Sequence, residues 1–249
     1  MKHIQCKNCD FQFEGNYCPQ CGQNANIERY NLKYLYKILL ESLDLERGFL
    51  STIFSLLYKP GLSIRLFIHG KRVGFYNSLK LFFISGAIAS LITFKFDLFN
   101  TNIGPLDFLS LPDQENYNYI SGKYFTFFTL DALPLFSLFT WIIFRKKGYN
   151  FSENFILNIY IASAQFILTI LYSPVLIFYS SDLSMTLYGM ILLIYNIWAV
   201  SVFFKAYSAG GLMASIASVL LPAVLILFIN YGVYRLSPDF IWESLELLF

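Results

Sequence analysis

Five long apolar stretches constrain this chain more than any other feature of its sequence. They cover residues 79–96, 124–144, 155–179, 183–204 and 212–231. Each has about 18–25 residues, and a helix rising about 1.5 Å per residue needs about 20 to cross a hydrocarbon core of about 30 Å. Only 14% of the residues are charged, whereas soluble domains carry about 25%. We therefore predict an all-α polytopic membrane protein with five transmembrane helices; four is the main alternative, because the first stretch is short.

The distribution of positive charge predicts how these helices are oriented. If the N-terminus is cytoplasmic, the inside segments are 1–80, 145–154 and 205–211, and they carry 15 of the 18 Lys and Arg residues. Such an excess marks the cytoplasmic side of a membrane. The N-terminal segment also lacks the apolar region of a signal peptide. We expect a cytoplasmic N-terminus and, after five spans, a periplasmic C-terminus.

Four cysteines near the N-terminus form the motif C-x2-C-x8-C-x2-C. They are Cys6, Cys9, Cys18 and Cys21. In a reducing cytoplasm such pairs indicate a metal site rather than disulfides, and two knuckles supply the four thiolates of a tetrahedral Zn²⁺ site. Residues 11–16 between the knuckles predict a short β-hairpin that joins them. The motif thus predicts a structural zinc ribbon over residues 1–25; rubredoxin-like iron and a dithiol pair are the alternatives.

Residues 26–78 between the ribbon and the first apolar stretch carry three helical patterns. The patterns run from Asn31 to about Leu43, over about 49–58 and over about 62–69, and the second is expected to stop at Lys59-Pro60-Gly61. Leucine and aromatic side chains follow one side of these helices and Lys or Arg the other, as in helices that lie on the cytoplasmic membrane surface. The alternative is a small helical subdomain packed on the bundle. The bundle itself is expected at 79–235, followed by an amphipathic tail at 236–249.

One acidic residue, Asp131, lies inside an apolar stretch. An ionised acid at membrane depth costs about 2.5–3.5 kcal/mol on insertion scales, so Asp131 is expected to face the bundle or a cavity. Amides in the neighbouring stretches could hydrogen-bond with it; these are Asn158, Gln165, Asn196 and Asn230. The group predicts an intramembrane polar site. It is either a proton or cation site, or a protonated or hydrated acid with a structural role.

The sequence offers little for catalysis. The only histidines, His3 and His69, lie outside every apolar stretch, and Asp131 has no second internal carboxylate for an aspartyl protease. The motifs of nucleotide hydrolysis and of zinc proteolysis are absent from the sequence. We therefore expect a protein that is not an enzyme, and the sequence identifies no small-molecule substrate.

Several short motifs together resemble one protein family. They are Cys-x2-Cys and Phe-x-Phe-x-Gly-x-Tyr-Cys-Pro-x-Cys-Gly-Gln in the ribbon, Arg-Gly-Phe-Leu-Ser-Thr at 47–52, Lys-Pro-Gly at 59–61 and Gly-Lys-Arg at 70–72. The pattern resembles an uncharacterised family of bacterial inner-membrane proteins that is common in the Bacteroidota and forms a domain of unknown function. The resemblance covers about residues 6–85. It implies a bacterial inner membrane and no established activity.

These observations support one leading hypothesis and two others. The leading hypothesis is an accessory or scaffolding subunit of a larger inner-membrane assembly, such as translocation, secretion or envelope machinery, with the ribbon as its docking element. Its partners would be the lipid bilayer and a membrane-protein complex. The first alternative is a small transporter or channel that uses Asp131. The second is contact of the ribbon with RNA or the ribosome, which the mixed charges around the ribbon make less favourable.

Overall fold

A computed structural model describes residues 4–6, 8–22, 48–71, 73–96, 98, 125–179 and 181–236 of the chain. The chain divides into two compact units, Met1–Glu46 and Arg47–Phe249. The helix predicted from Asn31 to about Leu43 lies outside the described residues. So do the side chain of Asn230 and the predicted tail beyond Leu236.

The N-terminal unit contains a small antiparallel sheet. Strand β1 (Ile4–Gln5) pairs with β2 (Gln12–Phe13), with Ile4 opposite Phe13. The predicted hairpin over residues 11–16 is therefore wrong in its position. The two strands enclose the first cysteine knuckle instead of joining the two knuckles, because Phe13 packs under the cysteines together with Ile4.

Two short helices open the C-terminal unit. Helix α2 (Phe49–Tyr58) has the predicted bounds, and α3 (Pro60–Ile68) begins two residues earlier than expected. Proline favours the first turn of a helix, where its missing N–H is not needed, so Pro60 starts α3 rather than ending α2. The Ser63 hydroxyl donates to the carbonyl oxygens of Ser55 and Lys59 at 3.1 and 2.8 Å, which fixes the corner between the helices.

Five longer helices follow in the part of the chain that the structure describes. They are α4 (Ser78–Phe96), α6 (Phe125–Ile143), α7 (Phe151–Phe178), α8 (Asp182–Phe204) and α9 (Ala209–Leu236), and the 3-10 turn η2 (Arg145–Lys147) follows α6. Among the described residues, α4, α7, α8 and α9 are long and apolar enough to cross a membrane. The described apolar part of α6, Thr129–Ile143, is shorter. The protein is thus mostly helical, with four candidate membrane-spanning helices, as expected of a multi-pass membrane protein.

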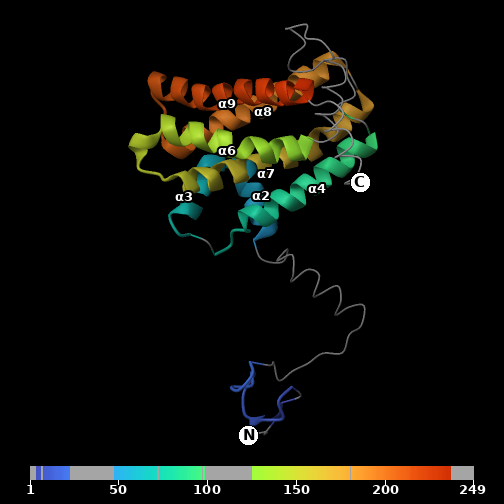
Figure 1. Ribbon diagram of the computed structural model, residues 1–249, viewed down its shortest axis with the longest axis vertical. Coiled ribbons are helices and arrows are strands. Elements are labelled where there is room, and N and C mark those ends of the chain that lie inside the picture. Colours follow the sequence, from blue (N-terminus) through green and yellow to red (C-terminus); the bar gives the residue numbers. More distant parts are fainter. Residues whose placement is uncertain are drawn as a thin grey trace. The chain divides into compact units, whose positions relative to one another are not determined.

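The long helices pack side by side (Figure 1). Helix α4 lies against α7, and contacts between consecutive members close α6, α7, α8 and α9 into a ring. Helix α7 begins with a capping box, in which the Asn150 side chain accepts from the Glu153 N–H and the Glu153 carboxylate accepts from the Asn150 N–H, both at 2.8 Å. This cap sets where the helix starts after the basic turn η2.

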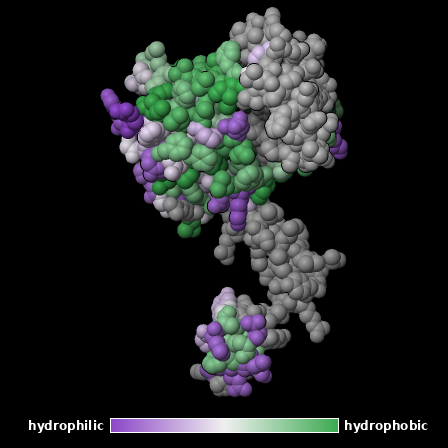
Figure 2. Space-filling model, viewed as in Figure 1, coloured by the Kyte–Doolittle hydropathy of each residue, from purple (hydrophilic) through white to green (hydrophobic). Residues whose placement is uncertain are grey.

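Helices α2 and α3 pack against this ring. Leu56 of α2 and Ile64 of α3 are each only 1% exposed and belong to the same buried cluster as Ala199 of α8. Such burial corresponds to the alternative of a helical subdomain packed on the bundle. The outer surface is different in character, because apolar side chains cover much of the visible face of the helical unit (Figure 2).

Candidate metal centre

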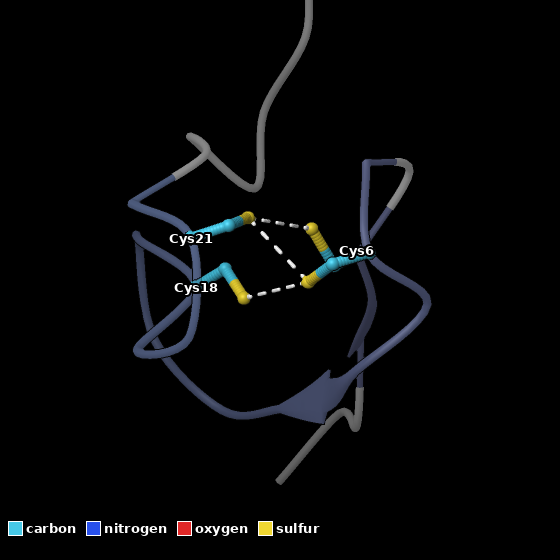
Figure 3. Close-up of side chains that lie close together, drawn as sticks. Cys6, Cys18 and Cys21 are labelled. Atoms are coloured by element: carbon cyan, nitrogen blue, oxygen red, sulfur yellow. Dashed lines mark hydrogen bonds between the residues drawn. The ribbon is translucent and has the colours of Figure 1, made fainter.

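The four cysteine thiols converge on one point in the N-terminal unit. The Sγ atoms of Cys6 and Cys21 lie 3.5 Å apart, those of Cys9 and Cys18 3.6 Å, and those of Cys9 and Cys21 3.5 Å. All four sulfurs lie within 4.8 Å of one another. A tetrahedral ion with metal–sulfur bonds of about 2.3 Å would place its ligands about 3.8 Å apart. The four predicted ligands are therefore brought together at a spacing that suits one metal ion (Figure 3).

Both knuckles use the same backbone turn. The Asp10 N–H donates to the Cys6 carbonyl at 3.0 Å, and the Gly22 N–H donates to the Cys18 carbonyl at 2.9 Å. Both residues have positive φ, 60° for Asp10 and 73° for Gly22. Glycine adopts this conformation without strain, and aspartate is one of the few residues with a side chain that tolerates it. The repeated turn brings each pair of cysteines onto one side of its loop.

The crowding of the four thiols disfavours their ionisation when no cation lies between them. The backbone N–H of Phe11 favours the thiolate of Cys9, but desolvation and the neighbouring thiols outweigh it and raise the pKa of Cys9 to about 12. Four thiolates at this spacing repel one another unless a metal ion neutralises them. Zn²⁺ and iron both accept four thiolate ligands, so the donor set fits the predicted Zn²⁺.

The predicted intramembrane polar site is brought together only in part. Asn158 and Gln165 of α7 and Asn196 of α8 line one cavity of about 40 Å³. Asp131 does not join them, because its side chain is exposed and lies outside the lining. The expectation that Asp131 faces the bundle or a cavity is therefore wrong. The residues of α6 that line the cavity are Thr129, Ala132, Leu133 and Phe136. Because successive residues of a helix are rotated by about 100°, Asp131 lies on a different face of α6.

Two residues of α3 make contacts that the sequence did not reveal. The Arg65 guanidinium donates to the Val202 and Phe203 carbonyls at 3.1 and 3.2 Å, at the C-terminal end of α8. A cation there complements the negative end of the helix dipole and adds a hydrogen bond to the last carbonyls, of which Val202 also accepts from the Lys205 N–H at 3.3 Å. Gly61 lies so close to the backbone of α8 that a Cβ atom would collide with it. The only sequence signal for these contacts was the Lys-Pro-Gly motif, which marks the corner but not its partner.

Basic side chains gather where α3, the segment after α6 and α8 meet. His69 Nε2 and the Tyr149 hydroxyl form a hydrogen-bonded pair at 3.2 Å, and Tyr149 packs on the rings of Phe203 and Phe204. Burial raises the pKa of Tyr149, although the nearby Arg65 acts in the opposite direction. Exposed cations of the described residues at this end include Arg145, Lys146, Lys147 and Lys205. We refer to these four residues as the basic end of the bundle.

Comparison with known proteins gives one partial match. The model of a family described as a protein of unknown function, DUF3667, matches residues 46–89. This segment contains α2, α3 and the first part of α4, which includes both Gly61 and Arg65. No curated protein and no solved structure matches the chain.

Proposed function

We propose that this chain is a multi-pass protein of a bacterial inner membrane that uses a cytoplasmic zinc ribbon to dock a partner onto a larger membrane assembly. It would serve translocation, secretion or envelope machinery as an accessory or scaffolding subunit and catalyse no reaction. One observation carries the proposal: a cluster of four thiols that could hold a metal ion belongs to the same chain as an apolar helical bundle, in a separate compact unit.

The donor set supports a structural role for the metal. Four cysteines fill the four positions of a tetrahedral ion and leave none open for a substrate. The buried cluster of the N-terminal unit contains Cys6, Cys18 and Phe13, with Ile4 and Cys9 beside it. So small a core cannot fold a domain alone, so most of its stability would come from the metal. A metal-stabilised ribbon without an open coordination position is suited to binding another macromolecule.

The basic end supports the proposed orientation. Arg145, Lys146 and Lys147 follow α6, and Lys205 follows α8, so the two helices place their cations at the same end of the ring. Anionic headgroups and the positive-inside bias both favour such an end at the cytoplasmic leaflet. Cysteine introduced at Lys147 should therefore react with a membrane-impermeant reagent in inverted vesicles and not in intact cells; the reverse pattern would contradict the orientation.

Docking can be tested by purifying the full chain from its native membrane in mild detergent, followed by mass spectrometry. We expect stoichiometric recovery of a partner with the native chain and with Gln20→Ser, an exposed non-ligand position within the second knuckle. Cys18→Ser should lose the partner while the helical bundle keeps its melting temperature. A monodisperse chain without a partner, or a partner retained in Cys18→Ser, would contradict docking through the ribbon.

The same preparation separates the two alternative functions. Ion or solute flux into liposomes that is lost in Asp131→Asn would favour a transporter or channel. Salt-sensitive RNA binding that is lost in Cys18→Ser would favour contact with the ribosome or RNA, since phosphate contacts weaken steeply with ionic strength.

A further inference from the structure

Helices α2 and α3, which we call the α2–α3 pair, have an apolar face that the described part of the chain leaves uncovered. The large exposed side chains of α2 are Leu50, Phe54 and Tyr58, which follow one another at four-residue steps and therefore share one face. Thr52 and Leu56 lie on another face of α2 and are buried where the pair packs on the bundle. A helix between a bundle and water normally exposes polar side chains, so the uncovered face requires an explanation.

The α2–α3 pair lies beside the long helices and not beyond their ends. The Tyr195 hydroxyl donates to the Leu56 carbonyl at 3.0 Å, and Tyr195 lies nine residues before Phe204, the end of α8, or about 13 Å along the helix. In Figure 1, α2 and α3 accordingly lie next to α7, within the length of the long helices. One leaflet of a bilayer contributes about 15 Å of hydrocarbon. If α8 crosses a membrane, the pair therefore lies at the depth of one leaflet.

The corner between α2 and α3 pairs backbone groups within the protein. Hydrocarbon offers no water to the carbonyls at a helix end, so a segment can lie there only when protein groups bind them. The Ser55 carbonyl accepts from the Lys59 N–H at 2.8 Å and from the Ser63 hydroxyl at 3.1 Å, while the Leu56 carbonyl accepts from Tyr195. Helix α3 begins with a proline, which has no N–H to satisfy. Two carbonyls in the last turn of α2 are thus paired without water.

The few charges of the α2–α3 pair are placed so that they do not oppose insertion. Between Phe49 and Ile68 the chain has two charged residues, Lys59 and Arg65. The Arg65 guanidinium is hydrogen-bonded to carbonyls at the end of α8. Lys59 is exposed at the corner, and a lysine at the edge of a membrane keeps its stem in the apolar region while its ammonium group reaches the headgroups. The remaining residues of the pair are uncharged.

We propose that the α2–α3 pair is embedded in the leaflet next to the basic end of the bundle, with the face formed by Leu50, Phe54 and Tyr58 in contact with lipid acyl chains. The depth of the pair identifies this occupant. Ile194, an exposed apolar residue of α8, directly precedes Tyr195, so the acyl chains that surround α8 at this depth also meet the outer face of α2. The pair enters and leaves the bilayer on one side and adds no span. The proposal rests on the membrane character of the bundle and is independent of the metal site and of docking.

Electron paramagnetic resonance of spin-labelled protein tests this environment, because molecular oxygen concentrates among acyl chains and a water-soluble nickel chelate is excluded from them. A nitroxide coupled to a ketone-bearing amino acid leaves the four cysteines unmodified. The full metal-loaded chain is placed in liposomes of phosphatidylcholine and phosphatidylglycerol, with one label per protein at Phe54, Ile194 or Tyr207. These side chains are similarly exposed, at 68%, 66% and 70%, but Ile194 belongs to a candidate membrane-spanning helix and Tyr207 follows the end of α8.

We expect the ratio of oxygen to nickel collisions at Phe54 to match that at Ile194 and to exceed that at Tyr207 several-fold. A ratio at Phe54 equal to that at Tyr207 would place α2 in water and overturn the proposal. Few collisions with either reagent at Phe54 would show that protein covers this face, either another part of this chain or a second copy, and would also overturn it. If Ile194 itself favoured nickel, the membrane assignment would fail as well, which distinguishes that outcome from a failure at Phe54 alone.

Discussion

Replacing Gly61 by alanine should drive α3 away from α8. A Cβ atom at this position would lie 2.9 Å from the carbonyl carbon of Val202, and closer still to the Ala199 carbonyl oxygen and the Phe203 amide nitrogen. Carbon atoms in contact normally lie about 3.5–4.0 Å apart, so the two helices must separate by about 1 Å. Because the obstructing atoms are backbone, no side-chain rotation can relieve the collision.

The expected cost of this change follows from two opposing effects. Overpacking a well-filled interface costs about 1–3 kcal/mol, and contact with rigid backbone places Gly61→Ala near the upper limit. Alanine recovers up to about 1 kcal/mol because its helix propensity exceeds that of glycine. The net loss is about 2 kcal/mol in the free energy of unfolding, or roughly 4–8 °C in Tm for a domain of this size.

Thermal unfolding in detergent, followed by tryptophan fluorescence, measures this loss, since Trp198 precedes the contact residue Ala199 in α8. The matched control is Gly189→Ala, at an α8 position where a Cβ atom meets nothing within 4 Å. That variant should melt at the native temperature or slightly above it. If Gly61→Ala melts like Gly189→Ala, then α3 and α8 do not approach as closely as described and the reasoning fails.

Further substitutions probe the metal site and the corner between α3 and α8. Cys18→Ser should reduce the bound metal, measured by elemental analysis, from about one ion per chain to none. In the native chain, acid should release the metal because protons compete for the thiolates. Asp10→Gly should tighten metal binding about 2–5-fold in a chelator competition, because the positive φ strains glycine about 0.5–1 kcal/mol less than aspartate. Gly22→Ala should weaken metal binding, because alanine is strained at the positive φ that Gly22 adopts. Arg65→Met should lower the free energy of unfolding by about 1–3 kcal/mol through loss of its charged hydrogen bonds to α8, whereas Lys205→Met, at an exposed position, should change it little.

Several local features of the fold followed from the sequence. The bounds of α2 were predicted from its apolar periodicity, and its end from the motif at residues 59–61. The start of α3 was misplaced because Pro60 was read as a terminator, although proline serves equally well in the first turn of a helix. The position of the hairpin was predicted wrongly because strand pairing depends on which other segment of the chain lies next to residues 12–13 in the folded unit. No periodic pattern in the sequence indicates that Ile4 pairs with Phe13.

The two candidate sites were predictable to different degrees. Spacing alone brought out Cys6, Cys9, Cys18 and Cys21, because a two-residue gap is a local constraint that any metal knuckle imposes. Position within an apolar stretch indicates how deep a polar residue lies but not which way it points. Asp131 was therefore misplaced, since the face that α6 turns inward is decided by its packing against α7 and α9.

By itself, the sequence indicated the membrane class, the asymmetry of positive charge and the four cysteines that could hold a metal ion. Each of these follows from composition or from spacings of a few residues, which chain geometry converts directly into structure. Only the tertiary structure decided that Arg65 binds the end of α8, 137 positions away in the chain, that Gly61 permits a close crossing, and that three amides share one cavity. Such contacts depend on which helix faces meet, and the faces of an almost uniformly apolar helix differ too little in polarity for periodicity to identify them.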